Sequence, residues 1–303
     1  MLAWAWGLKM QLKYLLLDVF TTERLKGNPL AAVLNADLLL DDQMQAIAAE
    51  FNLSETVFIK RPLAIKHTAA VRIFTPRVEL PFAGHPTIGA AVVLGLQTRS
   101  SAVRLEERIG LITCIMEKME KGTGLARFAL PQLPSETGKA PDPIRIAATL
   151  GIEPEEVGCG LYQPAVYSAG VDYYLVPVRD AAVLRRLKLE RRGWRDVYPI
   201  GHGAVYVFTE TPNERGNQIA ARMFSPGMGQ AEDPATGSAA AALIGLLAKF
   251  GNSGQTELVL RQGDEMGRPS RIFVQYRKEG DTLTHGGIGG HAVIVGEGTL
   301  DLG

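Results

Sequence analysis

Apolar residues along the chain follow two spacings, one typical of strands and one typical of helices. Residues 12–20 are apolar and aromatic and are predicted to form a strand. From Met44 to Phe51, apolar side chains recur at i, i+3, i+4 and i+7, which predicts a helix with one buried face. Residues 87–96 and 240–250 are almost wholly apolar, as in helices buried on all sides. The pattern therefore predicts a mixed α and β protein with two fully buried helices.

A proline-rich stretch divides the predicted elements into two groups. Residues 131–142 are rich in proline and small polar residues, which is typical of a linker. We therefore expect an N-terminal domain over residues 12–130 and a C-terminal domain over residues 143–303, with the last strand a candidate to cross back to the first domain. Further strands are predicted at residues 102–106, 110–117, 124–130, 204–209, 219–226, 257–261, 271–276 and 290–296, and further helices at 144–150 and 181–189.

A polar stretch, Glu-Asp-Pro-Ala-Thr-Gly-Ser-Ala at residues 232–239, runs directly into the second buried helix. The first N–H groups of a helix have no partner within the helix, and the positive end of its dipole attracts anions. On this segment alone, Asp233 and Thr236 are most simply interpreted as helix caps. The alternative is a polar binding site at the start of the helix.

A second copy of this arrangement favours the binding site. Residues 72–76 and 222–226 are both Arg, apolar, Phe, hydroxyl, Pro, and they lie about half the chain apart. Each is followed by a short loop, by His85-Pro86 or Asp233-Pro234, and by a buried helix. Repetition at half the chain length predicts a pair of domains related by a pseudo-two-fold axis, with both helix starts facing one interdomain cavity. His85 and Asp233 thereby become candidate site residues.

Glu55 is the candidate that breaks this symmetry. Strand alternation places it on the same face as Val57 and Ile59. If that face is the inner one, desolvation raises the pKa of Glu55 and suits it to exchange protons near neutral pH; the alternative is an exposed edge strand. The corresponding position in the second half lies near Gly203 and offers no carboxylate. Glu55 is therefore the single strong candidate for a general base.

Composition narrows the partners to small molecules. The 303 residues contain 32 Lys plus Arg and 32 Asp plus Glu without long charged runs, so we expect no nucleic-acid partner. Cys114 and Cys159 have neither a disulfide framework nor metal-ligand spacing, which fits a cytoplasmic protein. No apolar run is long enough to span a membrane, residues 1–10 do not resemble a targeting segment, and Met10 is an alternative start.

Two loops are ambiguous from sequence. The turn Gly27-Asn28-Pro29 is either a plain turn or a shaped loop that lines a pocket. The run Gly-Gly-Ile-Gly-Gly at residues 286–290 does not open a helix in a strand-helix-strand unit, so it is not predicted to bind a dinucleotide. It is predicted to be a glycine-rich turn or a close approach to the domain interface.

Taken together in order, the motifs resemble the phenazine-biosynthesis isomerase (PhzF-like) family, which has the diaminopimelate-epimerase-like fold. The resemblance extends over nearly the whole chain. The segments that carry it are residues 18–21, 27–31, 52–56, 72–76, 79–89, 232–242 and 266–270.

The resemblance implies an α+β fold of two pseudo-symmetric domains, each a mostly antiparallel, barrel-like sheet wrapped around a central apolar helix. It implies proton-transfer chemistry without cofactor or metal, and a homodimer. The family's acid/base carboxylate matches Glu55, its active-site histidine His85, and its aspartate and serine Asp233 and Ser238. Related epimerases use two facing thiols, but Cys114 and Cys159 lie outside both helix starts, which disfavours a two-thiol racemase.

We therefore predict an isomerase that moves a proton on a small carboxylate-bearing substrate, with Glu55, His85 and Asp233 as catalytic residues. The alternatives are an epimerase or racemase of a small carboxylic acid, and a ligand-binding protein without turnover on the same fold. The predicted substrate-binding residues are Asn28, Gly84, Thr87, Thr236, Gly237 and Ser238.

Overall fold

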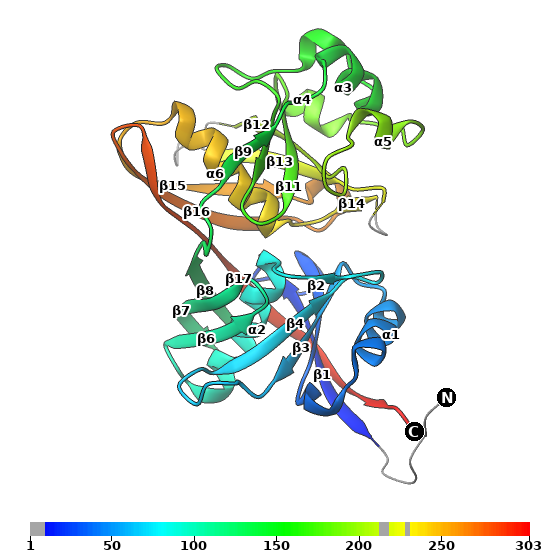
Figure 1. Cartoon of the computed structure of the whole chain (residues 1–303), viewed down its shortest axis with the longest axis vertical. Coiled ribbons are helices and arrows are strands. Elements are labelled where there is room, and N and C mark those ends of the chain that lie inside the picture. The colour runs from blue at the N-terminus through cyan, green and yellow to red at the C-terminus, as the bar shows by residue number, and fades with distance from the viewer. Residues whose placement is uncertain (1–9, 212–217, 228–230) are drawn as a thin grey trace.

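The computed structural model describes residues 10–211, 218–227 and 231–303, so residues 1–9 of the N-terminal segment lie outside the described part. The described chain forms two halves, one above the other, with strand β17 (Thr282–Asp301) running from one to the other (Figure 1). The α+β fold with barrel-like sheets predicted from the resemblance is confirmed. Within the described ranges, no helix combines the length and apolarity needed to cross a membrane.

The first half wraps its sheet around helix α2, and α1 packs on the outside of the sheet (Figure 1). Both predicted helices are present, and α2 is buried along nearly its whole length. The elements of this half are β1 (Gln11–Val19), β2 (Asn28–Val33), a 3-10 turn (Ala36–Leu38), α1 (Asp41–Phe51), β3 (Glu55–Lys60), β4 (Ala69–Phe74), β5 (Glu79–Leu80), α2 (Gly84–Thr98), β6 (Ala102–Glu107), β7 (Gly110–Glu120) and β8 (Thr123–Ala129).

The second half repeats this plan around helix α6, with α3, α4 and α5 on its outer side (Figure 1). Its elements are β9 (Ser135–Gly138), α3 (Pro143–Leu150), a 3-10 turn (Pro154–Glu156), β10 (Ala165–Ser168), β11 (Asp172–Pro177), α4 (Ala181–Arg185), α5 (Trp194–Val197), β12 (Val205–Glu210), β13 (Gln218–Phe224), β14 (Glu232–Asp233), α6 (Gly237–Phe250), β15 (Gly254–Gln262), a 3-10 turn (Asp264–Met266), β16 (Ser270–Glu279) and β17.

Two sequence interpretations are corrected by the strands that connect the halves. The stretch 131–142, expected to be a linker, contains β9, which pairs with β10 of the second half. The glycine run at 286–290 is not a turn, because it lies inside the 20-residue strand β17. It does approach the interface closely, since a Cβ on Gly290 would lie 2.3 Å from the ring of Phe20.

The repeat extends to individual side chains. In the first half the guanidinium of Arg72 makes two hydrogen bonds to Glu79 and lies 5.2 Å from the centre of the Phe74 ring. In the second half Arg222 makes the same paired bonds to Glu232, and it lies 5.0 Å from the centre of a phenylalanine ring. A bidentate arginine pair fixes the strand that carries the arginine to the segment that leads into each central helix.

The strand register corrects the alignment of the repeat. In the first half, Leu80 pairs with Ile73 of β4. In the second half, Asp233 pairs with Met223 of β13, so Leu80 and Asp233 occupy equivalent positions. The first-half proline equivalent to Pro234 is therefore Pro81, and not Pro86, the proline that follows His85. Counting onward from these prolines, Gly84 matches Gly237, and His85 matches Ser238.

The two central helices start against each other. A Cβ on Gly84 would lie 2.9 Å from the Cα of Gly237, and a Cβ on Gly237 would lie 3.1 Å from the Cα of Gly84. A side chain at Gly84 would therefore clash with the backbone of Gly237, and a side chain at Gly237 would make an unusually tight contact with the backbone of Gly84. Glycine at both positions therefore lets the N-termini of α2 and α6 meet at one point between the halves.

We expect Gly84→Ala to force the two helix starts apart and to lower the free energy of unfolding by about 1–3 kcal/mol, the usual cost of overpacking. Chemical denaturation measures the change. Gly296→Ala, in strand β17, is the control, because no atom lies within 4 Å of its added Cβ. Equal stability of the two variants would contradict the close contact.

Candidate active site

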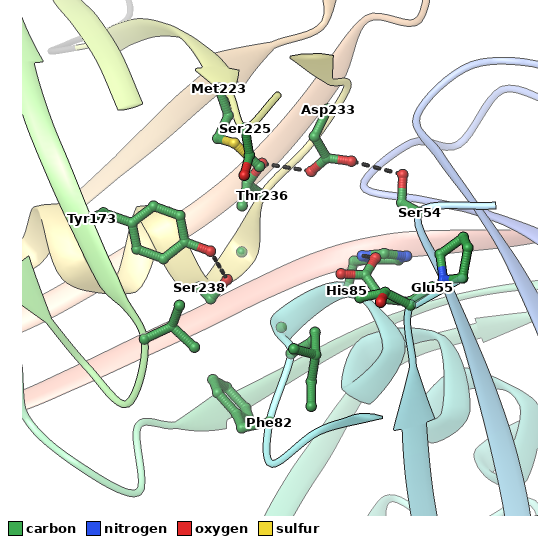
Figure 2. Close-up of a pocket in the computed structure, with 17 residues that line it drawn as sticks. Ser54, Glu55, Phe82, His85, Tyr173, Met223, Ser225, Asp233, Thr236 and Ser238 are labelled. Atoms are coloured by element: carbon green, nitrogen blue, oxygen red, sulfur yellow. Dashed lines mark hydrogen bonds and ion pairs between the residues drawn. The ribbon is translucent and has the colours of Figure 1, made fainter. Parts of the chain in front are cut away.

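A cavity lies between the halves at the meeting point of α2 and α6, and it receives polar side chains from both (Figure 2). The first half contributes Ser54, Glu55, Thr75, Pro76, Leu80, Phe82, Ala83, Gly84 and His85. The second half contributes Val171, Tyr173, Met223, Ser225, Asp233, Thr236, Gly237 and Ser238.

Asp233 is held by three hydrogen-bond donors. Asn28 Nδ2 and Ser54 Oγ, both from the first half, donate to Oδ1 at 2.9 and 2.8 Å. Thr236 Oγ1 donates to Oδ2 at 2.6 Å. Burial raises the pKa of Asp233, while these three donors lower it by stabilising the carboxylate. The simple capping interpretation is wrong, because the hydroxyl of Thr236 binds Asp233 and makes no cap bond to α6.

Glu55 has a much less favourable environment for charge. It begins β3 on the face that turns toward α2, so the inner-face prediction is confirmed and the exposed-strand alternative is wrong. Among the described residues, its buried Oε2 atom has no hydrogen-bond partner. Burial, and secondly the negative charge of Asp233, raise the pKa of Glu55 well above its usual range. When the two carboxyl groups share one proton, that proton therefore resides on Glu55.

His85 stands beside Glu55 in the first turn of α2 (Figure 2). Its Nδ1 lies 3.2 Å from Glu55 Oε2. Burial lowers the pKa of His85 to about 3, and this outweighs the opposing effect of the Pro29 carbonyl. The imidazole of His85 is therefore neutral near pH 7, so its contact with Glu55 is polar rather than ionic. Nε2 of His85 is buried without a hydrogen-bond partner among the described residues.

The opposite wall carries a pair of hydroxyl groups. Tyr173 from β11 and Ser238 from the start of α6 are hydrogen-bonded at 2.7 Å (Figure 2). Burial raises the pKa of Tyr173, so its phenol is neutral. The remaining surface near them is apolar, from Phe82 and Met223 among others. The cavity thus places acid groups on one side and neutral hydroxyls on the other.

Seven of the nine predicted site residues line this cavity, but Asn28 and Thr87 do not. Asn28 is fully buried behind Asp233, and its amide donates to Asp233 and to the carbonyl of Ala235, so it supports a site residue rather than facing a ligand. The hydroxyl of Thr87 points away from the cavity, toward the carbonyl of Ala83 and the carboxyl group of Glu107. Both lie outside the cavity lining, and their contact with a substrate stays a prediction.

Sequence reasoning missed several lining residues, of which Ser54 and Tyr173 are the most polar. Ser54 immediately precedes Glu55, within the segment 52–56 that carries the family resemblance, and this position was the available signal. Tyr173 gave no signal, because it lies on β11, 65 residues before its cavity partner Ser238. Cys114 and Cys159 lie outside the cavity, as predicted, and burial raises the pKa of Cys114. Within the described ranges, no three His, Cys, Asp or Glu residues are placed to hold a metal ion.

Comparison with known proteins places this chain in a family. A family model described as phenazine biosynthesis-like protein (PhzC-PhzF) matches residues 17–298. An uncharacterized isomerase of Mesorhizobium japonicum is 43% identical over 95% of this chain and 98% of its own length. Trans-2,3-dihydro-3-hydroxyanthranilate isomerase of Pseudomonas chlororaphis is 35% identical over 95% of this chain and 99% of its own length.

A solved structure agrees with these sequence relatives. The phenazine biosynthesis protein of the PhzF family from Bacillus anthracis superposes with a TM-score of 0.84 at 25% identity. The match covers 96% of this chain and 99% of that protein. Nothing in these lengths suggests a large insertion in either protein.

The three hydrogen bonds to Asp233 are expected to lower the pKa of this carboxyl group. We expect Thr236→Val, which removes one donor and keeps the shape, to raise the pKa of Asp233, because the carboxylate loses a stabilising hydrogen bond. Carboxyl carbon NMR across a pH series measures the change. Thr137→Val is the control, since the Thr137 hydroxyl bonds an exposed carboxylate, Asp172, instead. An unchanged pKa in Thr236→Val would contradict the network.

Proposed function

Because this chain belongs to the phenazine biosynthesis-like protein family and is an isomerase, we propose that it moves a proton within a small carboxylate-bearing substrate by general acid/base catalysis. Glu55 is the group that takes and returns the proton. His85 and Asp233 assist it. The reaction takes place in the interdomain cavity and uses side chains of this chain alone.

The observation that carries this proposal is the unequal pair of carboxyl groups. Asp233 has three donors, and Glu55 Oε2 has none among the described residues. Two titratable groups whose surroundings separate their pKa values are typical of acid/base sites. Asp233 is the better-stabilised anion, while burial raises the pKa of Glu55 toward the neutral range in which a general catalyst is most effective.

In the proposed cycle, ionised Glu55 removes a proton from a carbon next to an unsaturated, electron-withdrawing group. The electron pair of the broken C–H bond enters the conjugated system of the substrate. The carboxylic acid of Glu55 then returns the proton at another carbon along that system. Neutral His85 offers Nε2 to the substrate as a hydrogen-bonding group, because its low pKa prevents it from competing for the proton.

Charge on the substrate is balanced by the helix starts. The first N–H groups of α2 and α6 converge beside Gly84 and Gly237, and a carboxylate at this point is stabilised by both helices. Ser238 and Tyr173 supply hydroxyl groups on the same side. This favours small unsaturated carboxylic acids as substrates, and trans-2,3-dihydro-3-hydroxyanthranilate, named for the Pseudomonas chlororaphis relative, is the first compound to test.

We expect Glu55→Gln to lower the rate of substrate isomerisation about 10²–10⁴-fold, the usual contribution of a general acid/base. Turnover in deuterium oxide, followed by NMR, shows at which carbon solvent hydrogen enters. Exposed Glu50→Gln on α1 is the matched control. Unaltered exchange in Glu55→Gln would remove Glu55 from this role. Exchange with inversion at a single carbon would favour an epimerase, and stabilisation by acids without exchange would favour a binding protein.

The pH profile tests the coupling of the two carboxyl groups. Glu55 acts first in its ionised form, so kcat/KM rises with pH through the raised pKa of Glu55. Replacing Asp233 with Asn removes a negative charge that raises this pKa. We therefore expect Asp233→Asn to move the rising limb to lower pH, in addition to any loss of rate. If the rising part of the pH profile of kcat/KM stayed at the same pH in Asp233→Asn, this result would contradict the coupling between Glu55 and Asp233.

A further inference from the structure

Behind the first turn of α2, on the side away from the cavity, lies a carboxyl group that the proposed reaction does not use. Glu107 ends strand β6 with its side chain on the inner face of the sheet, and the residue is only 8% exposed. Its Oε1 lies 2.7 Å from Thr87 Oγ1. Among the described residues, its Oε2 is buried and has no hydrogen-bond partner. A buried carboxylate with one polar neighbour would be poorly stabilised.

The neighbouring hydroxyl shows which group carries the proton. Thr87 Oγ1 lies 2.8 Å from the carbonyl of Ala83 as well as 2.7 Å from Glu107. A hydroxyl has one hydrogen to donate, and a carbonyl oxygen can only accept. Both contacts are hydrogen bonds only if Thr87 donates to Ala83 and Glu107 donates to Thr87. Glu107 must then be a neutral carboxylic acid.

The pseudo-symmetry of the fold supplies independent support. In the first half Ala69, three residues before Arg72, pairs with Leu105. In the second half Ile219, three residues before the matching arginine, pairs with Leu260. Two residues further along β6 and β15 lie Glu107 and Gln262 respectively, so these two side chains occupy equivalent positions.

Gln262 supports the start of α6 from behind. Its Nε2 donates to the carbonyl of Asp233 at 2.8 Å and to Thr236 Oγ1 at 3.0 Å. Its Oε1 accepts from the backbone N–H of Thr236 at 3.1 Å. Gln262 is a neutral group that both donates and accepts. A protonated glutamic acid has the same shape and the same ability to donate and accept, whereas a glutamate can only accept.

We propose that Glu107 is a positioning residue: as a neutral acid it donates to Thr87 and fixes the first turn of α2, which presents Gly84 and His85 to the cavity. The effect on catalysis rests on the proposed function, whereas the protonation of Glu107 does not. Glu107 thus does for α2 what Gln262 does for α6.

The surroundings of Glu107 favour the neutral form. α2 presents the Thr87 hydroxyl, and β7 presents the thiol of Cys114, which the charged form of Glu107 would make still less acidic. No cation is among the groups that shift the titration of Glu107 within the described part of the chain; burial raises the pKa of Glu107 to about 8, and the Thr87 hydrogen bond only partly opposes this. Raising the pH above 8 therefore ionises Glu107 inside the fold.

The first experiment compares the melting temperatures of Glu107→Gln and the unaltered protein across a pH series. The folded protein keeps the Glu107 proton up to about pH 8, but the unfolded chain releases it near the ordinary value of 4.5. Ionisation of the unfolded chain therefore destabilises the unaltered protein as pH rises between these values. We expect the melting temperature of Glu107→Gln to rise relative to that of the unaltered protein from pH 5 to 8. Above pH 8 we expect the difference between the two melting temperatures to stay constant. No substrate is needed.

The adjacent residue gives a control of opposite sign. Glu106 accepts hydrogen bonds from the backbone N–H groups of Leu63 and Ala64, and these lower the pKa of Glu106. That carboxylate contributes stability above the unfolded pKa and loses it as pH falls. We expect Glu106→Gln to become less stable than the unaltered protein as pH rises. A pH-independent gap for Glu107→Gln, or one with the sign of Glu106→Gln, would overturn the proposal.

Two further measurements address protonation and positioning. Difference infrared spectroscopy at pH 7 should show a protonated-carboxyl band that Glu107→Gln lacks, and absence of that band would overturn the proposal.

For catalysis, we expect Glu107→Leu to lower kcat about tenfold through the lost hydrogen bond, and Glu107→Gln to recover most of that loss. Activity of the unaltered protein should fall above pH 8, and this fall should be absent in Glu107→Gln. Equal losses in both variants at all pH values would leave Glu107 without a positioning role.

Discussion

The backbone contact between Gly84 and Gly237 sets the geometry on which the rest of the molecule depends. Two buried helices start at this point, so their positive ends face each other in a low-dielectric interior. The arrangement is unfavourable for the helices and favourable for any anion between them. The duplicated arginine–glutamate pairs fix the segment that leads into each helix, and the sheets hold the helices from outside. The anion site is therefore a property of the symmetric fold.

The two halves of the repeat carry different residues at equivalent positions of the cavity, and these differences supply the acid/base groups of the proposed reaction. By the strand register, the first-half residue equivalent to Asp233 is the hydrophobic Leu80. Ser238 is the second-half residue equivalent to His85. The first half thereby provides an acid with few partners and a neutral histidine, and the second half provides a buried carboxyl group with three hydrogen-bond donors, together with hydroxyl groups. A symmetric site would bind a carboxylate equally from both sides. In the proposed reaction, the differences between the two copies give the cavity one side for proton transfer and one side for binding the substrate.

The sequence predicted what local pattern controls and missed what pairing controls. The buried helices, most strands and the inner face of Glu55 followed from periodicity, and seven of the nine predicted site residues line the cavity. The repeat was found but aligned on the wrong prolines, because only the strand pairs reveal that Pro81 matches Pro234. Asn28 and Thr87 lie behind the cavity lining, which the sequence did not show, because a segment near a site does not reveal the direction of its side chains. Tyr173 required the tertiary structure itself.

Strand β17 has a consequence for how the chain is made. Its second part, from Ala292 to Asp301, pairs with β1, and its middle pairs with β8, so the first sheet is completed by residues near the end of the chain. During synthesis, the N-terminal half cannot close until translation has passed residue 301. The edges of β1 and β8 that pair with β17 therefore lack their partner strand during almost all of translation. Unpaired strand edges promote aggregation, so these two segments are the ones most in need of protection by a chaperone.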